Sequence, residues 1–573
     1  MKIAIIDKAP SRNDYSKYFP FEFELFHMSS VPVAKLLKKD VDLDIDVSLY
    51  DLVILVGSEA AKEYAKITSV TNFAGILVDD KFVAITNPAM LVFKPEGKPD
   101  FERAVSKIIK YASGEGMSIA KGDYKGIDTE EEAVDFLYEV LKSDAPYVAM
   151  DTEGTALYPR DGYVLGISVT HKPYFGRYIL TDVITDRVFD LLQRIIDKFE
   201  IVFHNKKYDI KMLEYHTLLR FRRDATHDTM IEHYVLDENG QHGLKALCLK
   251  YTDLGDYDAE LDEFKVQYCS QHGMLQEDFT YDLVPFNIIS KYASIDTCGT
   301  WLLHAKFIPI IKASDKLSFV YNKLLIPGTF FLNGMEEAGI PISRERMQAA
   351  EVYLNEQVEV AKQKLYDFKE VHALEADQGA IFNPNSVPQL RKLLFDYLNL
   401  TPTGKLTKAG AISTDAEVLE ELSDEHPLPK AILTLRQMSK MKNTYISKIL
   451  PEIDRDGRIR TNFNLTFTTS GRLSSSGKFN AQQIPRDDPI IKGCIVAPEG
   501  YSIISQDLQT GEMYYAAVLS GDKNLQEVFR SGGDFHSTIA KMVFDLPCAV
   551  EDVKALFPEM RQSAKAISFG INL

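Results

Sequence analysis

Four carboxylates and one tyrosine are spaced so that they could act together in catalysis. In YVAMDTEGT, Asp151 and Glu153 lie two residues apart at the end of an apolar strand, so the alternation of a strand puts both on one face. In IVFHNKKYDIKML, Asp209 follows a strand at the start of a helix. In KYASIDTCGT, Tyr292 and Asp296 are spaced i and i+4, which puts them on one face of a helix.

Carboxylates that meet in one cleft repel each other unless cations lie between them. Hard oxygen ligands suit Mg²⁺ or Mn²⁺, and a pair of such ions can ionise water and stabilise the leaving oxygen in phosphodiester cleavage. The tyrosine could orient the attacking water. Each acid taken singly is more often a helix cap or a surface residue, so only the three segments in this order indicate the chemistry. We therefore expect two Mg²⁺ or Mn²⁺ ions per active site.

A second group of chemically capable residues lies nearer the end of the sequence. TTSGRLSSSGKFNAQQIPR is rich in hydroxyls, amides and cations, which contact phosphates and minor-groove acceptors, although its composition also fits a solvated, turn-rich loop. In YSIISQDLQTGE we expect an apolar strand that delivers Asp507, a natural magnesium ligand for a triphosphate, and then a helix that starts at Glu512. His536 follows in GDFHSTIAKMVF.

The last segment, PEMRQSAKAISFGINL, predicts a helix with a functional face. Arg561, Lys565 and Phe569 recur at four-residue steps after a proline and an acid that favour a helix start. Two cations on one face can hold a triphosphate, and an aromatic ring can cover a sugar or base. In isolation, a solvated basic face with a core Phe fits the same pattern equally well.

The surrounding pattern indicates several domains. Residues 1–115 contain the short buried strands KIAIID and DLVILVGS, a further strand or pair in GILVDDKFVAI, and the amphipathic helix FERAVSKIIKYA. In residues 117–310 the helix TEEEAVDFLYEVLKS and strands such as VLGISVTH predict a mixed sheet flanked by helices. Residues 311–460 read as helical, and residues 461–573 as a strand-rich segment that leads into helices. The expected fold class is α/β and α+β, with several domains.

Composition restricts where the protein works. No run of about eighteen apolar residues exists, so we expect no membrane span. The five cysteines are widely spaced and include no CxxC pair, which argues for a reducing cytoplasm and against disulfides or a thiolate zinc site. The formal charge of −18 makes nucleic acid a less obvious partner, but local patches decide binding.

DTEGT, HNKKYD and YASID resemble the three motifs of the DEDDy 3′–5′ exonucleases, the proofreading class. The resemblance implies four metal ligands and a water-orienting tyrosine, namely Asp151, Glu153, Asp209, Asp296 and Tyr292. It also implies a supporting acid, Asp228, and two positions beside the substrate strand, His204 and Asn205.

TSGRLSSSGKFNAQQIP, DLQTGE and RQSAKAISFG together resemble the motifs of the family A DNA polymerases, with one extra residue before Asn480 and with DLQTGE in place of the more frequent DYSQIE. The resemblance makes Asp507 a catalytic metal ligand and Glu512 the steric gate against a ribose 2′-hydroxyl. The nucleotide contacts that it implies are Glu512, His536, Arg561, Lys565 and Phe569. The DNA contacts that it implies are Arg472, Lys478, Asn480, Gln482 and Arg486.

The resemblance covers about residues 120–573 and is greatest to the replicative polymerases of T-five-like tailed phages, in segments such as MKIAIIDKA and IIKGCIVAP. It implies a ribonuclease H-like 3′–5′ exonuclease domain at 117–310, a thumb-side helical region at 311–460, and partial palm and fingers of a right-hand polymerase at 461–573. The N-terminal α/β extension at 1–115 faintly resembles uracil-DNA glycosylase folds. Asn87-Pro88-Ala89 replaces their His-Pro-Ser signature, which favours an interaction or DNA-tracking module over an active glycosylase.

The expected function is template-directed DNA synthesis with 3′–5′ proofreading. However, the family's second palm carboxylate, in a His-Asp-Glu motif, has no counterpart here, and the family pattern fails after Ile571. We therefore expect the N-terminal portion of a split polymerase, whose second piece supplies that carboxylate. An intron or intein joint, or an incomplete sequence, would explain the same pattern. The alternatives are an exonuclease that acts alone with a non-synthesising, DNA-binding polymerase remnant, and a degenerate accessory subunit, which the intact exonuclease acids disfavour.

The expected partners are a DNA primer–template, single-stranded 3′ ends, dNTPs and a C-terminal polymerase fragment, with no membrane. The expected location is the cytoplasm of an infected bacterial host cell.

Overall fold

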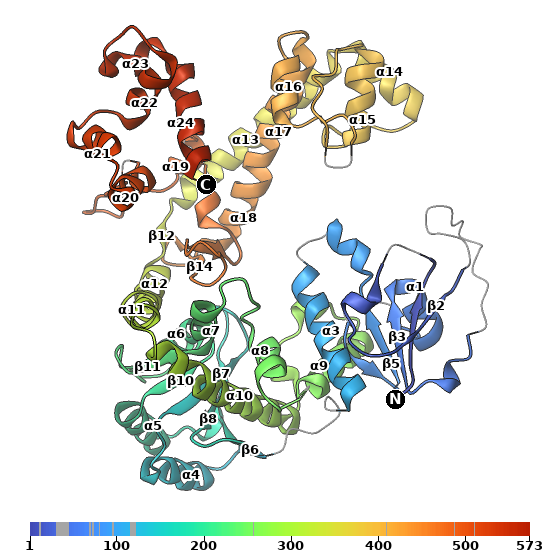
Figure 1. Ribbon diagram of the computed structural model, residues 1–573, viewed down its shortest axis with the longest axis vertical. Helices are drawn as coiled ribbons and strands as arrows, with labels where there is room; N and C mark the ends of the chain where they lie inside the picture. Colours follow the sequence, from blue (N-terminus) through green and yellow to red (C-terminus); the bar gives the residue numbers. More distant parts are fainter. Residues whose placement is uncertain are drawn as a thin grey trace. The chain divides into compact units, whose positions relative to one another are not determined.

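The chain forms two compact units in the computed structural model, Met1–Ile495 and Val496–Leu573 (Figure 1). The structure describes residues 1–10, 13–29, 45–67, 70, 74–79, 81–93, 97–114, 122–255, 257–407, 410–485, 488–508 and 510–572. Within these ranges, no helix is both long and apolar enough to cross a bilayer.

The first sheet has five strands in the order β2-β1-β3-β5-β4. Its strands are β1 (Ile3–Asp7), β2 (Glu24–His27), β3 (Leu52–Val56), β4 (Leu77–Val78) and β5 (Phe82–Ile85). The central strands are parallel and buried on both faces, which explains their unbroken apolar sequence. Ile3 and Ile5 pack toward α3 (Lys98–Ser113), and Ala4 and Ile6 pack toward α1 (Gly57–Ala65). The strands predicted at KIAIID and DLVILVGS are confirmed.

The second sheet has six strands in the order β11-β10-β7-β8-β9-β6 and is mixed, as predicted. Its strands are β6 (Asp123–Ile127), β7 (Val148–Gly154), β8 (Val164–Thr170), β9 (Phe175–Leu180), β10 (Ile201–Phe203) and β11 (Thr226–Asp228). Helices α4 (Glu130–Lys142) and α5 (Asp186–Lys198) share one hydrophobic core with one face of the sheet. The long helix α10 (Phe286–Lys312) lies against the other face (Figure 1).

Shorter helices surround α10 and the edge of this sheet. They are α6 (Lys206–His216), α7 (Thr229–Leu236), α8 (Leu244–Tyr251) and α9 (Ala259–His272). Both α7 and α8 contact α10, while α6 contacts β7 and β10. The helices that carry candidate site residues are therefore anchored to the sheet or to α10.

Residues 311–460 are helical, as predicted. The helices are α11 (Asp315–Phe319), α12 (Ile326–Ala338), α13 (Arg344–Tyr366), α14 (Lys369–Gln378), α15 (Val387–Arg391), α16 (Ala416–Leu422), α17 (Pro427–Lys440) and α18 (Ser447–Ile449), with π-helical turns at Val320–Leu325, Lys392–Tyr397 and Met441–Ile446. Two short antiparallel pairs join β12 (Ile340–Pro341) to β13 (Arg458–Ile459), and β14 (Asn462–Asn464) to β15 (Ser474–Ser476). The first unit ends just after the short helix α19 (Pro489–Lys492).

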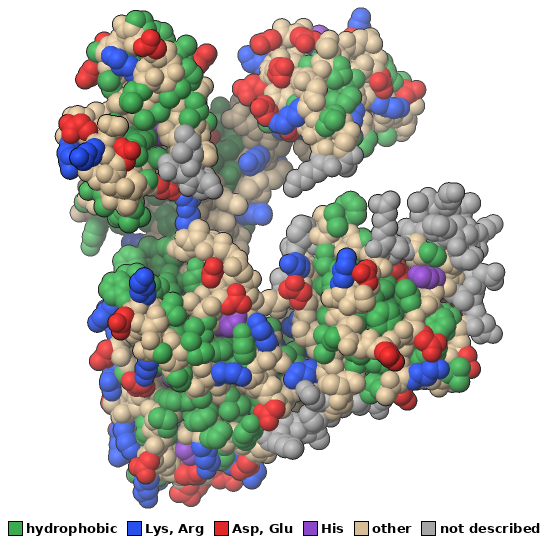
Figure 2. All heavy atoms as spheres, in the orientation of Figure 1, with side chains coloured by type: hydrophobic (Ala, Val, Ile, Leu, Met, Phe, Trp, Pro, Cys, Tyr) green, Lys and Arg blue, Asp and Glu red, His purple; other side chains and the backbone are tan. Residues whose placement is uncertain are grey.

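The second unit is helical and has a small core. Its helices are α20 (Gly511–Ser520), α21 (Lys523–Arg530), α22 (Phe535–Phe544), α23 (Val550–Leu556) and α24 (Pro558–Asn572). Residues of α22, α23 and α24 form a buried cluster with Leu546. Figure 2 shows hydrophobic side chains on the surface of this unit, and Leu519 and Met542 are among the exposed ones.

The strand that we predicted at YSIISQDL is wrong. Residues 501–508 have no regular secondary structure, and their apolar side chains are exposed, with Ile504 82% and Leu508 75% accessible. A strand needs a neighbour to pair with its N–H and C=O groups, and no described residue pairs with this segment. The apolar pattern of residues 501–508 is therefore typical of a strand, but no strand forms here.

Candidate functional site

Strand β7 presents its two acids on the face that α10 covers. Val148 and Met150 belong to the core shared with α4 and α5, so the alternation of the strand places Asp151 and Glu153 on the opposite face. Candidate ligand oxygens of Asp151, Glu153 and Asp296 lie within 4.8 Å of one another. Two elements that are distant in the sequence therefore bring three of the predicted carboxylates together.

A left-handed turn positions the fourth carboxylate. Asn205 takes φ 63° and ψ 50° just before α6, a conformation that Asn adopts more readily than most residues. The Asp228 carboxylate holds this turn by accepting the backbone N–H groups of Asn205 at 3.0 Å and Lys206 at 2.9 Å. Asp228 thus has the supporting contacts that the sequence implied. Helix α6 begins directly after this turn, and Asp209 is buried in the first turn of the helix. Its Oδ1 has no hydrogen-bond partner among the described residues.

Burial and mutual repulsion shift the titration of this cluster. Removal from water, with Asp296 close by, raises the pKa of Asp151 to about 7. Burial and the neighbouring Asp151 raise the pKa of Glu153 and of Asp209. Burial and Asp296 also raise the pKa of Tyr292, so its phenol keeps the proton. The cluster is therefore short of positive charge in the metal-free protein.

Lys245 of α8 supplies one positive charge to this cluster, and sequence reasoning missed it. Its ammonium group donates to Asp296, and the hydroxyl of Tyr257 donates to the same carboxylate oxygen. The ammonium also lies 4.0 Å from the centre of the Tyr292 ring. Burial works to lower the pKa of Lys245, but the charges of Asp296 and Asp258 and the hydrogen bond to Asp296 together outweigh burial, and the pKa is raised. A lysine one turn before the buried Cys248 and Leu249 was the available sequence signal.

The residues around this cluster fit divalent cations of the Mg²⁺ class. All four carboxylates offer hard oxygens, and three of them converge. The fourth, Asp209, has a buried Oδ1 without a hydrogen-bond donor among the described residues, and a cation could take the place of that donor. His204, whose Nδ1 lies 2.9 Å from Thr229 Oγ1, is neutral because burial lowers its pKa to about 3. Asn205 is exposed beside it.

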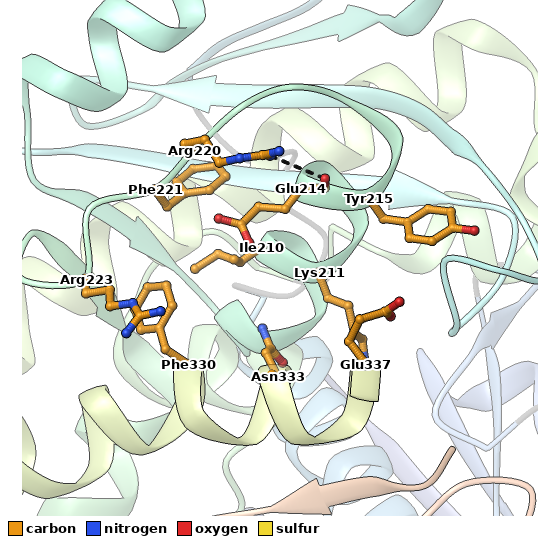
Figure 3. Close-up of a pocket in the computed structure, with 11 residues that line it drawn as sticks. Ile210, Lys211, Glu214, Tyr215, Arg220, Phe221, Arg223, Phe330, Asn333 and Glu337 are labelled. Atoms are coloured by element: carbon orange, nitrogen blue, oxygen red, sulfur yellow. Dashed lines mark hydrogen bonds between the residues drawn. The ribbon is translucent and has the colours of Figure 1, made fainter. Parts of the chain in front are cut away.

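Helix α6 is also anchored from outside the sheet. The buried carboxylate of Glu336 on α12 accepts from Lys207 and, at 3.1 Å, from Lys211, which flank Asp209. It also accepts the backbone N–H of Phe463 on β14 at 2.7 Å. Helices α6 and α12 also border a hollow of about 430 Å³, whose lining includes Arg220 and Phe330 (Figure 3), and no predicted site residue lines it.

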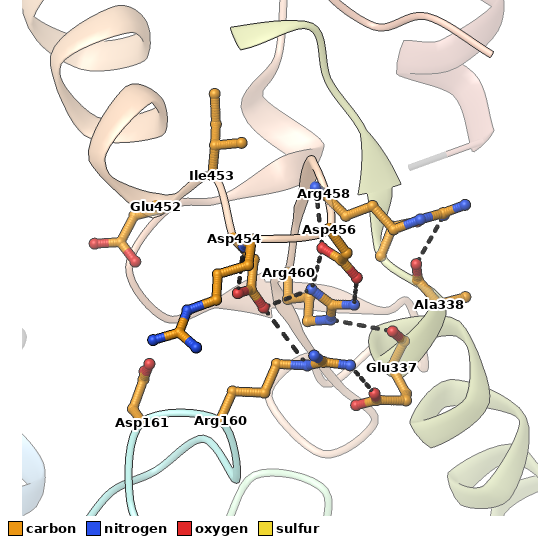
Figure 4. Close-up of polar contacts among 12 residues, drawn as sticks. Arg160, Asp161, Glu337, Ala338, Glu452, Ile453, Asp454, Asp456, Arg458 and Arg460 are labelled. Carbon is orange, nitrogen blue, oxygen red and sulfur yellow. Dashed lines mark hydrogen bonds and ion pairs between the residues drawn. The ribbon is translucent and has the colours of Figure 1, made fainter. Parts of the chain in front are cut away.

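An ion-pair network ties the loop after β7 to residues 454–460 (Figure 4). Arg160 contacts Glu337 and lies 3.5 Å from Asp454, which also accepts from Arg460 at 2.9 Å. Lys478, a predicted DNA contact, lies close by and pairs with Asp161 at 3.1 Å and Glu452 at 2.8 Å.

The other predicted DNA contacts follow the same segment. Asn480 accepts from Ser475 and from the backbone N–H of Gln482, and the Gln482 side chain donates to Leu473 O, so these two residues stabilise the turn. Arg472 is exposed. Arg486 lies outside the described residues.

The second unit brings three predicted nucleotide contacts together. Glu512, His536 and Lys565 line one hollow of about 520 Å³. Burial, together with Arg561, lowers the pKa of His536. Asp507 is exposed on the segment that lacks a strand and does not line this hollow.

The remaining two residues of the α24 face are placed differently. The guanidinium of Arg561 forms a two-point contact with Asp534, Nε to Oδ2 at 2.6 Å and Nη2 to Oδ1 at 2.9 Å. Sequence reasoning missed Asp534, although its place before FHSTIAKMVF is typical of a helix N-cap. Phe569 lies on α24, and its side chain is outside the description.

A mixed sheet with three converging acids and a fourth buried beside them, followed by a helical region, fits an enzyme that cleaves nucleic acid with the help of metal ions. Two family models match the chain: 3′-5′ exonuclease over residues 124–312 and DNA polymerase family A over residues 348–572. The chain is 48% identical to the DNA polymerase of Escherichia phage T5, a match that covers 100% of this chain and 70% of that protein. It is 30% identical to DNA polymerase I of Pseudomonas aeruginosa, over 75% of this chain and 46% of that enzyme.

A solved structure also resembles the chain. The POL domain of Pol1 from M. smegmatis, in complex with DNA primer-template and dNTP, matches 78% of this chain and 71% of that chain, with a TM-score of 0.58 and 26% identity. The chain therefore belongs to family A of the DNA polymerases and carries a 3′–5′ exonuclease domain. The resemblance seen in the sequence motifs is confirmed.

Replacing Lys245 should change metal binding. In Lys245→Met, Mn²⁺ no longer competes with the ammonium for Asp296, so we expect about tenfold tighter binding, or about 1.4 kcal/mol, by calorimetry. The metal-free variant should also melt at a lower temperature because the carboxylates lose their counter-charge. Lys250→Met, an exposed lysine on the same helix, is the control. Unchanged Mn²⁺ affinity in Lys245→Met would contradict the assignment.

The Arg561–Asp534 contact predicts a pH effect in the second unit. The hydrogen bonds from Arg561 lower the pKa of Asp534 to about 2, so its stabilisation is present above the unfolded value of about 4 and is lost as the pH falls through 2. Asp534→Asn should flatten this loss between pH 4 and 2. Hydrogen exchange of the α22 and α24 amides, corrected for intrinsic rates, measures it. The exposed Asp552→Asn is the control, and equal slopes in both variants would refute the prediction.

Proposed function

We propose that this chain shortens DNA from single-stranded 3′ ends, with Asp151, Glu153, Asp209 and Asp296 as the ligands of two divalent ions. The observation that carries the proposal is the convergence of Asp151, Glu153 and Asp296 from β7 and α10 beside a protonated tyrosine, with the buried Asp209 of α6 close enough to be repelled by Asp151. When bound there, two Mg²⁺ or Mn²⁺ ions would supply an ionised water and neutralise charge on the leaving oxygen.

The side chains of the chain position the reactants. Tyr292 keeps its phenolic proton and so can donate it in a hydrogen bond to the attacking water or to a phosphate oxygen. Lys245 holds Asp296 from the protein side, which fixes the direction of that carboxylate. His204 and Asn205, at the turn before α6, are the groups proposed to lie beside the substrate strand.

We also propose that the polymerase region takes part in template-directed synthesis with a primer–template and dNTPs. Glu512, His536 and Lys565 share one hollow, which supports a nucleotide site there, with Asp507 as its metal ligand. Arg561 would bind a triphosphate by exchanging the Asp534 carboxylate for phosphate oxygens, which are equivalent acceptors. Phe569 is proposed for the sugar, and Arg472, Lys478, Asn480, Gln482 and Arg486 for the DNA.

Synthesis needs a further polypeptide segment, we infer, as in a split polymerase. The 573 residues hold the first palm motif but no counterpart of the second palm carboxylate. Residues 501–508 expose apolar side chains that suit pairing with a neighbouring strand, and an exposed apolar patch of this kind marks an interaction surface. The proposed location is the cytoplasm of an infected bacterial host cell.

The domain limits at 115, 310 and 460 stay a prediction, as does an interaction or DNA-tracking role for the first sheet. The exonuclease model match begins at residue 124 and ends at 312, which supports the limits on both sides of that domain.

Loss of the β7 acids should abolish exonuclease action. For Asp151→Ala/Glu153→Ala we expect release of nucleotides from a labelled single strand to fall by more than about 100-fold, since even outer-shell partners of a metal are worth about 10- to 100-fold. Asp224→Ala, an exposed acid of the same region, should retain activity. A double variant that keeps more than a tenth of the rate would disprove the ligand assignment.

Primer extension should fail with this chain alone. The exonuclease-deficient double variant, supplied with a primer–template, Mg²⁺ and four dNTPs, is expected to add no nucleotides, because one of the two palm carboxylates is absent. Adding a polypeptide with the family's second palm carboxylate should restore extension. Efficient extension without it would overturn the argument, and failure to restore would favour an exonuclease with a non-synthesising remnant.

A further inference from the structure

A second cluster of metal-ligand side chains lies apart from the carboxylate site. His227 on β11, Glu232 on α7 and His304 on α10 each offer a ligand atom, and these atoms lie within 4.8 Å of one another. All three residues are buried. None of them is a predicted exonuclease or polymerase residue, so their convergence needs its own explanation.

Glu232 is the centre of this cluster and is incompletely satisfied. Its Oε1 accepts from the hydroxyl of Tyr321 at 2.9 Å and lies 2.7 Å from His304 Nδ1. Its Oε2 is buried and has no hydrogen-bond partner among the described residues. A buried polar atom without a partner destabilises the folded state, so a ligand that contacts this oxygen would stabilise the fold.

The surroundings of His227 resemble those of a metal-binding histidine. Its Nε2 lies 3.3 Å from the Glu200 carboxylate, and its Nδ1 lies 3.2 Å from the Tyr321 oxygen. A carboxylate beside one ring nitrogen is the common arrangement around metal-bound histidines. The other nitrogen, Nδ1, faces the Tyr321 oxygen; because Tyr321 donates its own proton to Glu232, zinc at Nδ1 would displace the proton that His227 shares with Tyr321.

We propose that His227, His304 and Glu232 bind one zinc ion, with the Tyr321 oxygen next to the fourth position. Two imidazoles and a carboxylate form a borderline donor set that suits Zn²⁺ better than Mg²⁺ or Ca²⁺. Zinc bonds of about 2.0 Å place ligand atoms about 3.3 Å apart, so the contact between His304 and Glu232 would widen slightly as zinc replaces the proton between them.

The position of this site indicates a structural role. Because the residues are buried, the site is closed, which is typical of structural rather than catalytic zinc. It would fasten together β11, α7 and α10, and α10 also carries Tyr292 and Asp296. Tyr321 extends the contact to Val320–Leu325, where the chain passes toward α12. Zinc would therefore fix α10 to the start of the thumb-side region.

Metal content tests the proposal directly. After expression in zinc-supplemented medium and dialysis without chelator, mass spectrometry of the 573-residue chain should find about one zinc per chain. His304→Gln and Glu232→Gln should retain less than about 0.1. The control His233→Gln replaces a buried histidine of the same helix that pairs with His242 instead, and it should keep the zinc. Asp151→Ala/Glu153→Ala should also keep it, which separates this site from the exonuclease carboxylates.

A measurement on the unaltered chain covers the case in which a variant fails to fold. Removing the metal with a chelator should lower Tm, and adding back one equivalent of ZnCl₂, but not MgCl₂, should restore it because only the folded state binds the ion. Co²⁺ in place of zinc should give the visible absorption of a four-coordinate site. Wild-type chain without zinc and with no Tm response to ZnCl₂ would overturn the proposal. So would zinc that persists in His304→Gln and Glu232→Gln.

Discussion

Mutual repulsion among four acids is the constraint on which the exonuclease region depends. Asp151, Glu153 and Asp296 converge from one strand and one helix, and Asp209 approaches from another helix. Burial strengthens the repulsion because it removes the screening of water. One buried ammonium, from Lys245, offsets part of this negative charge, and we propose that divalent cations offset the rest. A rigid scaffold is needed, since carboxylates that were free to move would separate.

The same constraint explains why α6 is held from two directions. On its sheet side, Asp228 and the left-handed Asn205 start the helix. On its outer side, Lys207 and Lys211 are fastened to Glu336, which also accepts from the backbone of Phe463. Helix α6 is thereby joined to strand β14, which precedes the segment that we propose to bind DNA. A displacement of α6 would displace β14 as well, because both elements donate hydrogen bonds to the buried carboxylate of Glu336.

The second unit has a smaller buried core than the exonuclease region, and one two-point ion pair, between Arg561 and Asp534, also stabilises it. Its core is a small cluster from α22, α23 and α24, and the Arg561–Asp534 pair fixes α24 to the start of α22. The predicted nucleotide residues are therefore partly assembled, with Glu512, His536 and Lys565 around one hollow. Asp507 is not assembled with them, because its segment has no strand to pair with. The predicted nucleotide contacts are thus brought together in this unit, whereas the predicted metal ligand Asp507 is not placed beside them.

The sequence by itself determined what depends on short-range periodicity. Alternation put Asp151 and Glu153 on one face, the i and i+4 spacing put Tyr292 and Asp296 on another, and the order of the motifs identified the family. Only the tertiary structure decided which distant groups meet. Nothing near Lys245 in the chain indicates that it contacts Asp296, and nothing near Arg561 indicates Asp534. The strand expected before Asp507 fails for the same reason. Helix and strand faces follow from local geometry, whereas ion pairs and strand pairing require partners that only folding brings together.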